Sequence, residues 1–299
     1  MKASIIKLKF NTAIHYGNSG KPGLLNSDNM ILSDTLYSAL IDNNPKILDK
    51  LLNLVENNDL RISDLFPYVS NHLLIKKSLK PFKFSGDLEI DRTLYKKMKN
   101  TQYILLNKIN EYYNDCSPKL INDTYNISSE IGTSYIQTRN RVSRNNEDTV
   151  PYIVSNFRFN KNSGLYLIVK YSSKNNLDFL INELKKLGLI GIGGRRSSGL
   201  GKFEILSIEE YNEPTNGKLL LTSTILPNKL ESNIRFNVIK RSGFYNTNEG
   251  SFKKRDIYAI ESGLILSNEL NGQILSDLGK EHTIYRILMP LYVRVEIWK

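Results

Sequence analysis

The sequence predicts an α+β fold made of two lobes, the first of which is a ferredoxin-like unit. Strand and helix patterns follow one another in the order strand, helix, ribbon, strand, helix, loop, strand, which resembles a ferredoxin-like unit with a long insertion. Around residues 211–217 the composition turns to Pro, Gly and Asn. Because such a stretch is typical of a domain boundary, we expect one domain at residues 1–211 and a second, smaller α+β lobe at residues 218–299.

In the first lobe, the spacing of apolar residues predicts each element. Residues 2–13 alternate at nearly period two, which predicts a strand. After Ser33, which we expect to be an N-cap, apolar residues recur three and four positions apart and predict a short helix. Helical patterns over residues 45–57 and 89–114 predict a helical insertion at about residues 45–114.

The middle of the chain is predicted to contain a β-ribbon and a glycine-rich loop. Two strand-like limbs separated by a polar turn predict the ribbon at residues 132–160. A buried strand at 165–171 and an amphipathic helix at 176–187 follow, and a glycine-rich loop at 188–201 leads into a strand at 202–208. The sequence contains no repeat of fixed period, which argues against a solenoid or a propeller.

Charge and composition limit the function. The 41 Lys and Arg against 30 Asp and Glu leave a formal charge of +11, and 40% of the residues are hydrophobic. The apolar content suffices for a core, and the charge favours a polyanionic partner, nucleic acid first. Because the sequence has no apolar stretch of about 18 residues and no signal peptide, we expect a cytoplasmic protein without a membrane partner. The lone Cys116 fits a reducing compartment.

The glycine-rich loop is the most informative stretch for function. It combines six glycines with two adjacent arginines and two adjacent serines. Backbone N–H groups without side chains can approach a phosphate closely, while guanidinium and hydroxyl groups add charge and donors. The predicted RNA-binding residues here are Gly191, Gly193, Gly194, Arg195, Arg196, Ser197, Ser198 and Gly199. A hairpin that needs its glycines only for a tight turn is the alternative.

The sequence predicts no cofactor and no metal. A mononucleotide P-loop needs Ser or Thr after its lysine, whereas Phe203 follows Lys202. In a dinucleotide fingerprint starting at Gly191, the third glycine position holds Arg196. Three scattered histidines, one cysteine and carboxylates without a cluster form neither a zinc pattern nor a two-metal pattern.

The ribbon has the residues that single-stranded RNA requires. Arg139 and Arg141 are two apart and so share one face, and Arg144 is expected near the tip. Tyr135 and Tyr152 are close enough in the pattern to stack on bases. A charged hairpin that arginine keeps soluble explains the same pattern, and this alternative stays open.

The second lobe carries a basic set of its own. Its members are Lys240, Arg241, Lys253, Lys254 and Arg255. Contact with RNA and docking onto a protein partner would both use such a set. We expect Lys240 and Arg241 to contact RNA.

His15 decides between a binding protein and an enzyme. It follows the first strand beside a loop with three glycines, where it could bind the RNA backbone. An imidazole near neutral pH could instead act as general acid or base in RNA cleavage without metal. His72 and His282 are remote in sequence. We therefore place His15 among the RNA-binding residues and expect no catalytic residue.

These segments together resemble a known family. The chain contains the loop Gly-Ile-Gly-Gly-Arg-Arg-Ser-Ser-Gly-Leu-Gly-Lys-Phe, which is similar to the glycine-rich loop of the RAMP superfamily of CRISPR proteins. Its form looks like that of one family there, the fourth subunit of the Csm effector complex of type III-A systems. Similar segments of that family match residues 15–17, 33–40, 139–144, 240–244 and 254–258.

The resemblance implies both a fold and a function. It implies two ferredoxin-like (RRM-like) lobes, with the ribbon acting as a thumb that interrupts base stacking at the junction of tag and guide. It also implies a non-catalytic RNA-binding subunit of an antiviral ribonucleoprotein. Such a subunit grips the repeat-derived 5′ tag of the crRNA, contacts the large signature subunit and abuts the adjacent backbone subunit, and we expect no homo-oligomer.

Two other functions remain open. One is a metal-independent CRISPR endoribonuclease of the same superfamily that uses His15. The other is an assembly scaffold whose basic patches bind acidic protein surfaces. RNA cleavage in EDTA would identify the endoribonuclease, and partner binding that survives nuclease treatment would identify the scaffold.

Overall fold

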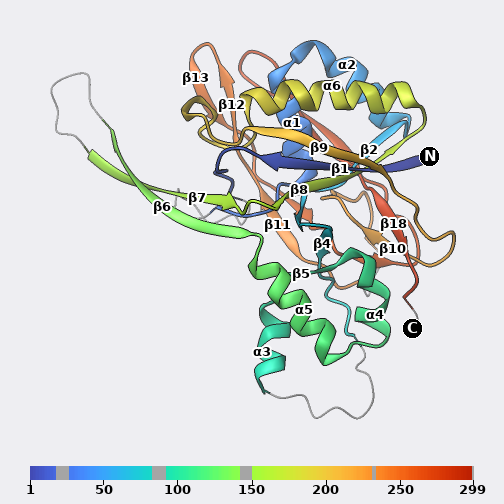
Figure 1. The fold of residues 1–299 in the computed structure, drawn as a ribbon. Coiled ribbons are helices and arrows are strands. Elements are labelled where there is room, and N and C mark those ends of the chain that lie inside the picture. The colour runs from blue at the N-terminus through green and yellow to red at the C-terminus, as the bar shows by residue number, and fades with distance from the viewer. Residues whose placement is uncertain (18–26, 83–91, 142–149, 231–233, 298–299) are drawn as a thin grey trace.

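A seven-stranded antiparallel sheet forms the centre of the computed structural model, which describes residues 1–17, 27–82, 92–141, 150–230 and 234–297 (Figure 1). Its strands are β1 (Lys2–Phe10), β2 (Leu60–Ile62), β3 (Phe66–Val69), β4 (His72–Lys76), β5 (Tyr103–Leu105), β8 (Ser163–Tyr171) and β9 (Phe203–Glu210). Six of them follow the order β5-β4-β3-β8-β1-β9, and β2 also pairs with β8. The strands at β1, β8 and β9 confirm the predicted sheet segments.

Helices α1 (Ser33–Asn43) and α6 (Lys174–Ile190) pack against each other on one side of the sheet. The short η1 (Pro45–Ile47) and α2 (Leu48–Glu56) follow α1. The strand order β9-β1-β8-β3, with α1 after β1 and α6 after β8, is the β-α-β-β-α-β arrangement of a ferredoxin-like unit. The first part of the chain therefore has the topology that its sequence pattern predicted.

The two helices begin differently. Ser173 caps α6, since its hydroxyl oxygen accepts a hydrogen bond from the backbone N–H of Asn176. Ser33 was predicted to cap α1, but Leu32 occupies the N-cap position and Ser33 is the first helical residue. The hydroxyl of Ser33 instead accepts a hydrogen bond from the backbone N–H of Thr224 (3.2 Å). A contact with the C-terminal part of the chain has thus replaced the local cap.

The insertion at about residues 45–114 is only partly helical, and the prediction of a helical insertion is corrected here. Residues 60–76 contain β2, β3 and β4, which extend the central sheet. The single helix expected at residues 89–114 is interrupted by β5, and its residues 89–91 lie outside the described part. The sequence of β5 is Tyr-Ile-Leu, which favours a strand, and it pairs with β4.

Three helices stand apart from the sheet, at the bottom of the view in Figure 1. They are α3 (Arg92–Asn100), α4 (Ile109–Asn114), which follows η2 (Leu106–Lys108), and α5 (Pro118–Ser129). We call α3, α4 and α5 the appendage. Ser117 caps α5 by accepting a hydrogen bond from the backbone N–H of Leu120 (3.2 Å), and α5 leads directly into the ribbon.

The predicted ribbon is confirmed and projects from the body of the molecule (Figure 1). Its strands β6 (Gly132–Arg141) and β7 (Val150–Phe159) pair antiparallel along their whole lengths. At the base, Ile14 and Phe157 exchange two backbone hydrogen bonds of 2.8 Å. The segment after β1 therefore fixes the direction in which the ribbon leaves the body.

The C-terminal part consists of strands in residues 218–230 and 234–297. A three-stranded sheet has the order β15-β10-β18, and three two-stranded pairs accompany it. The strands are β10 (Lys218–Leu221), β11 (Val238–Arg241), β12 (Phe244–Thr247), β13 (Gly250–Lys253), β14 (Ile257–Ile260), β15 (Ile265–Leu266), β16 (Gln273–Leu278), β17 (Thr283–Leu288) and β18 (Tyr292–Val295). The prediction of an α+β lobe is wrong for these described residues, because their sequence has strand patterns but no segment with helical spacing.

One hydrophobic core joins the two parts of the chain. Leu8 and Leu36 belong to the same cluster of buried side chains as Leu220, Val293 and Val295 of the C-terminal strands. Fully burying a side chain of this size stabilises a fold by about 1.5–3 kcal/mol, so the C-terminal strands support the first part directly. Among the described helices, none has the length and apolar character needed to cross a membrane.

Candidate nucleic-acid interface

The glycine-rich loop is a compact reversal of the chain between α6 and β9. Gly188, predicted to open the loop, lies inside the last turn of α6. Gly191 ends the helix with a φ of +101°, and the N–H of Ile192 donates to the carbonyl of Gly201 (3.0 Å). A Cβ on Gly191 would lie 2.5 Å from the oxygen of Leu200, and one on Gly201 would lie 2.0 Å from the oxygen of Ile192. These two glycines are therefore required by the loop itself.

His15 packs against this loop. Its carbonyl oxygen accepts a hydrogen bond from the N–H of Gly194 (2.8 Å), and its Nδ1 lies 2.6 Å from the carbonyl oxygen of Ser155 in β7. Because a carbonyl only accepts, Nδ1 carries a hydrogen, and in the neutral ring Nε2 is then the acceptor. A Cβ on Gly194 would lie 2.8 Å from His15 Cδ2, and one on Gly193 would lie 2.8 Å from the His15 oxygen. His15 thus joins the loop to the ribbon, and both glycines permit its close approach.

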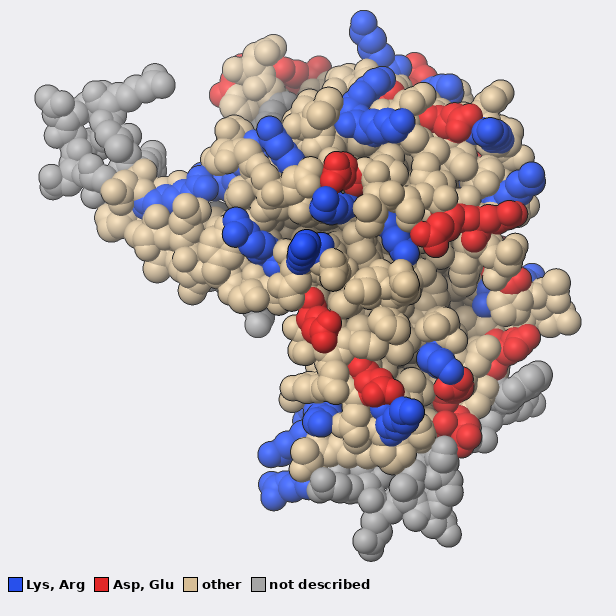
Figure 2. Space-filling view, in the orientation of Figure 1, with Lys and Arg blue, Asp and Glu red and all other residues tan. Residues whose placement is uncertain are grey.

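The ribbon completes the same surface through Arg139 and Tyr152, which lie toward the outer end of its described strands. Arg139 donates through Nη1 to the hydroxyl of Ser198 in the loop (3.0 Å), and the Arg195 guanidinium lies 5.1 Å from the centre of the Tyr152 ring. Arg139 and Tyr152 are directly opposite each other on β6 and β7. Figure 2 shows Lys and Arg side chains along the ribbon and on the adjoining body. Loop and ribbon, predicted as separate contacts, are therefore one surface.

Part of the predicted cradle of free backbone N–H groups is occupied within the protein. The N–H groups of Gly191, Gly194, Ser198 and Gly199 each donate to a carbonyl of the protein itself. These N–H groups form internal backbone hydrogen bonds of the loop region, so they are not free to bind phosphate. The prediction therefore stands only for the other backbone groups, the guanidinium groups and the hydroxyl groups of the loop.

Part of the loop faces open space. A Cβ built on Gly199 would meet no atom within 4 Å, and Ser197 and Ser198 are exposed. Arg195 has a left-handed φ of +62°, which is uncommon for a residue with a side chain. Arg196 is more restrained, because its Nη2 lies 2.6 Å from Asp42 Oδ2 at the end of α1. Hydroxyl and guanidinium donors on an open surface suit an oxyanion such as a phosphate.

The second basic set is mostly neutralised by carboxylates. Four of its cations form the pairs Lys240–Asp256, Arg241–Asp34, Lys253–Asp256 and Arg255–Asp277. Arg241 is only 7% exposed, and both of its bonds to Asp34 measure 3.0 Å. Burial opposes the charged form of Arg241, but the Asp34 carboxylate holds its pKa above the ordinary value. The prediction that Arg241 contacts RNA is therefore wrong, whereas Lys240 remains a prediction.

Two predicted ribbon contacts lie at the limit of the described residues. Arg144 falls outside them. Arg141 is the last residue of β6, and only its backbone is described. Of the predicted ribbon cations, Arg139 alone is placed by its side chain.

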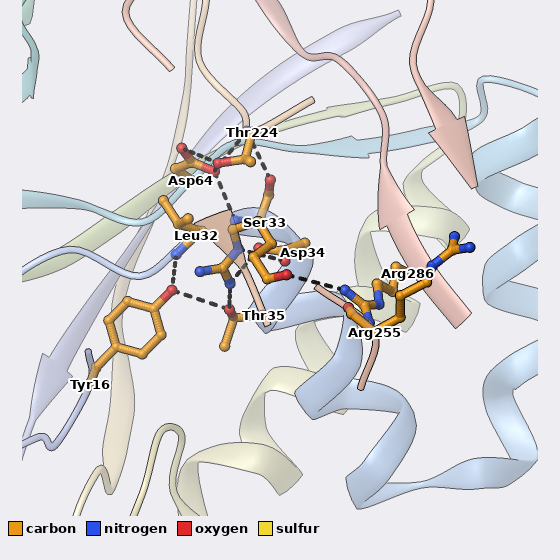
Figure 3. Close-up of polar contacts among 10 residues, drawn as sticks. Tyr16, Leu32, Ser33, Asp34, Thr35, Asp64, Thr224, Arg255 and Arg286 are labelled. Carbon is orange, nitrogen blue, oxygen red and sulfur yellow. Dashed lines mark hydrogen bonds and ion pairs between the residues drawn. The ribbon is translucent and has the colours of Figure 1, made fainter. Parts of the chain in front are cut away.

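A buried polar cluster, which we call the junction, comprises Ser33, Asp34, Asp64, Thr224 and Arg241 (Figure 3). Asp64 Oδ1 accepts hydrogen bonds from the N–H groups of Ser33 (2.8 Å) and Thr224 (3.0 Å). Burial raises the pKa of Asp64 to about 6, although these hydrogen bonds act in the opposite sense. The junction joins α1 to the C-terminal strands. Sequence reasoning missed it because Asp64 and Thr224 are 160 residues apart.

The described residues offer little for metal or thiol chemistry. No three His, Cys, Asp or Glu side chains among them are grouped as metal ligands. Cys116 is buried, and burial raises the pKa of its thiol to about 11, so it stays protonated near neutral pH.

Solved structures share the fold of the whole chain. A chain in the crystal structure of a Csm1–Csm4 cassette in complex with pppApA superposes with a TM-score of 0.64, at 18% identity and with 100% of each chain covered. A chain in the crystal structure of a Csm3–Csm4 subcomplex, from the type III-A CRISPR-Cas interference complex, gives 0.62 at 19% identity, covering 99% of this chain and 100% of the other.

Family comparison defines first the class and then the family. The model of the RAMP superfamily matches residues 7–204, more than half of the chain and the part that contains His15, ribbon and loop. A second model, the CRISPR Csm4 C-terminal domain, matches residues 214–295. The chain belongs to the Csm4 family of the RAMP superfamily.

Curated relatives align over nearly the whole chain. The CRISPR system Cms protein Csm4 of Mycobacterium tuberculosis (strain ATCC 25618 / H37Rv) is 29% identical over 308 residues, covering 98% of this chain and 98% of the relative. The protein of the same name from Streptococcus thermophilus is 27% identical over 308 residues, covering 95% and 96%. Both lobes of the chain therefore have counterparts in these relatives.

Proposed function

We propose that this chain is a non-catalytic RNA-binding subunit of a type III CRISPR effector and that it binds the 5′ tag of the crRNA. The observation that carries the proposal is the convergence of the loop, His15 and the ribbon on one surface. Among the described residues, the guanidinium groups of Arg139 and Arg195 there have no carboxylate partner. Cations beside exposed hydroxyls and tyrosine rings are the groups that bind and stack a single-stranded RNA.

The proposal includes protein partners. Solved relatives pair Csm4 with Csm1 in one complex and with Csm3 in another. We therefore propose that this chain joins the large signature subunit to an adjacent backbone RAMP subunit, and that it does so as a single copy in the cytoplasm. Residues 1–211 would supply most of the RNA contacts, with Lys240 as a further contact, and residues 218–299 would stabilise them through the junction.

In this proposal His15 positions the loop and does not catalyse. Its carbonyl binds Gly194, its Nδ1 binds Ser155, and its ring lies against the backbone of the loop. Nε2 remains an acceptor, which is what a general base requires. Cleavage of RNA by His15 is therefore the competing function that the experiment has to detect.

The test is binding and cleavage measured in the same samples. The full chain is incubated in EDTA with 5′-labelled RNA that carries the tag or a scrambled sequence. We expect intact RNA and tighter binding of the tagged strand. Arg139→Gln with Arg195→Gln should weaken binding by about 3 kcal/mol, since a bond to a charged group contributes roughly 1.5–3 kcal/mol and two such groups are lost. The salt dependence should fall by about 1.4 in log–log slope for two lost phosphate contacts.

A matched control is Lys174→Gln with Lys229→Gln, which removes the same charge from two exposed positions away from the loop. It should leave tag preference unchanged. Specific cleavage that His15→Ala abolishes would replace the proposal with an endoribonuclease. Failure of the wild-type chain to retain RNA, with partner binding intact after nuclease treatment, would replace it with a scaffold.

A further inference from the structure

The outer face of α3 is a basic surface. Arg92, Lys96 and Lys99 follow one another at spacings of four and three residues, so they lie on one side of the helix. All three side chains are exposed, and Tyr95 stands among them with 54% of its surface accessible. No residue of α3 is fully buried. The sequence pattern alone assigned no role to this segment.

The inner face of α3 attaches the helix to the rest of the appendage and to the core. Leu94 and Met98 pack against the hydrophobic core. Lys97 donates to the amide oxygen of Asn122 in α5 (2.8 Å), and its ammonium group lies 5.6 Å from the centre of the Tyr125 ring. These contacts fix which side of α3 faces outward, so the basic face is held in one direction.

The charges on α3 oppose its own stability. Like charges four and three residues apart repel each other in a helix. Arg92, in the first turn, also faces the positive end of the helix dipole. The helix contains no acidic residue, and within the described part of the chain no carboxylate forms an ion pair with Arg92, Lys96 or Lys99. A bound polyanion would offset both the repulsion among these cations and the unfavourable interaction of Arg92 with the helix dipole.

The appendage and the ribbon flank the same side of the molecule. α5 runs into β6 through Glu130 and Ile131, and Asn160 at the end of β7 binds the carbonyl oxygens of both (2.8 and 3.1 Å). Figure 1 shows α3 and α5 on the side from which the ribbon projects. In Figure 2, Lys and Arg side chains gather at the outer end of the appendage, and the surface is hollowed between it and the ribbon.

We propose that the outer face of α3 is a second RNA-binding site, which takes the phosphate backbone of single-stranded RNA outside the tag. The three cations are spaced along the helix by about 6 Å and about 4.5 Å at a rise of 1.5 Å per residue, so they form a row. A row of cations with an exposed tyrosine is the combination that binds a nucleic-acid strand with little sequence preference. The site goes beyond the tag contact and does not depend on it.

The experiment compares two RNAs, the tag alone and the tag with the guide attached. In the full chain, Arg92→Gln with Lys96→Gln and Lys99→Gln should weaken binding of the longer RNA about tenfold and lower its salt slope by about 2. Binding of the tag alone should stay within about twofold of the wild type. The control Lys46→Gln with Lys174→Gln and Lys229→Gln removes as much charge from other exposed positions. Equal affinity of variant and wild type for the longer RNA would overturn the proposal.

A second measurement identifies the occupant directly. A photo-reactive amino acid in place of Tyr95, in the assembled effector, should cross-link to the crRNA beyond its tag or to bound target RNA. Cross-links only to a protein subunit would overturn the proposal in favour of a protein interface. The Arg139→Gln with Arg195→Gln variant separates the two proposals. This variant should weaken the binding of both RNAs. Unchanged binding would contradict the proposed tag site, but it would not affect the result obtained with the α3 variant.

Discussion

The glycine-rich loop and the strand β11 are similar in sequence but differ in the structure. Each has two adjacent cations followed by serine and glycine, with Arg195 and Arg196 in the loop and Lys240 and Arg241 in β11. In the loop, Arg195 lies over a tyrosine ring at the surface. In β11, Arg241 is 7% exposed and bound to Asp34. Arg195 thus lies at the surface, whereas Arg241 joins two distant parts of the chain.

The difference shows that the nearest carboxylate, and not the number of cations, decides what a basic segment does. Asp34 is 207 residues from Arg241 in the chain. No local pattern around Arg241 could have indicated that pairing. The basic face of α3 resembles Arg195 in this respect, since its cations have no carboxylate partner among the described residues, whereas Arg196 of the loop is paired with Asp42.

The largest effect should follow from breaking the buried pair. Arg241→Met leaves Asp34 charged and unpaired in the junction, and loss of one partner of a buried pair costs about 3–5 kcal/mol. We expect the free energy of unfolding, measured by urea titration, to fall by that amount. Arg195→Met in the loop should change it by at most about 0.5 kcal/mol, because Arg195 lies at the surface.

The double variant Asp34→Asn with Arg241→Met tests whether the unpaired charge of Asp34 causes the loss of stability. Removing the carboxylate charge should restore part of the lost stability, because the cost arises from an uncompensated charge. Equal losses from Arg241→Met and Arg195→Met would show that the loop and β11 do not differ in the way described.

A smaller effect should follow from pH, through Asp64. Its pKa is raised from 3.8 to about 6 in the folded protein, so the folded state binds the additional proton between these values. Stability from this group is therefore present at low pH and is lost as pH rises from about 4 to about 7, by about 3 kcal/mol. Urea titrations over this range would measure the loss.

Asp64→Asn is the matched variant. Its amide is neutral at every pH, and its oxygen can still accept from the N–H groups of Ser33 and Thr224. The difference in stability between variant and wild type should change by about 3 kcal/mol between pH 4 and pH 7. A constant difference would show that Asp64 titrates normally and that the junction is accessible to water. The loop has no such buried carboxylate, so its contribution to stability should not change between pH 4 and pH 7.

Local patterns predicted much of the fold. The strands at β1, β8 and β9, the helices α1 and α6 and the ribbon follow from apolar spacing within short windows. The strands β2 to β5 were missed or assigned to helices, because they are three to five residues long and depend on pairing with β8 and β4. The second lobe was expected to be α+β, but its described residues contain only strands.

The candidate site, like the fold, could be predicted from the sequence only in part. Sequence patterns located the loop and the ribbon, but only the structure shows that His15 contacts Gly194 and that Arg139 contacts Ser198. It also shows that backbone N–H groups of the loop are already bonded, for example Gly194 to His15. The junction depends on residues distant in sequence, so no motif could have revealed it.

The smallest effect separates two glycines of the loop. Both Gly199 and Gly201 have left-handed φ values, +82° and +77°, so alanine is strained at either position by about 1–2 kcal/mol. At Gly201 the new Cβ would also lie 2.0 Å from the backbone oxygen of Ile192, whereas at Gly199 it would meet nothing within 4 Å. We expect Gly201→Ala to lower the unfolding free energy by about 1–3 kcal/mol more than Gly199→Ala does.

Thermal or urea unfolding of the two variants measures this difference directly. Equal destabilisation would mean that the loop is not held by the crossing of Ile192 and Gly201, and its open surface would then not be preformed for RNA.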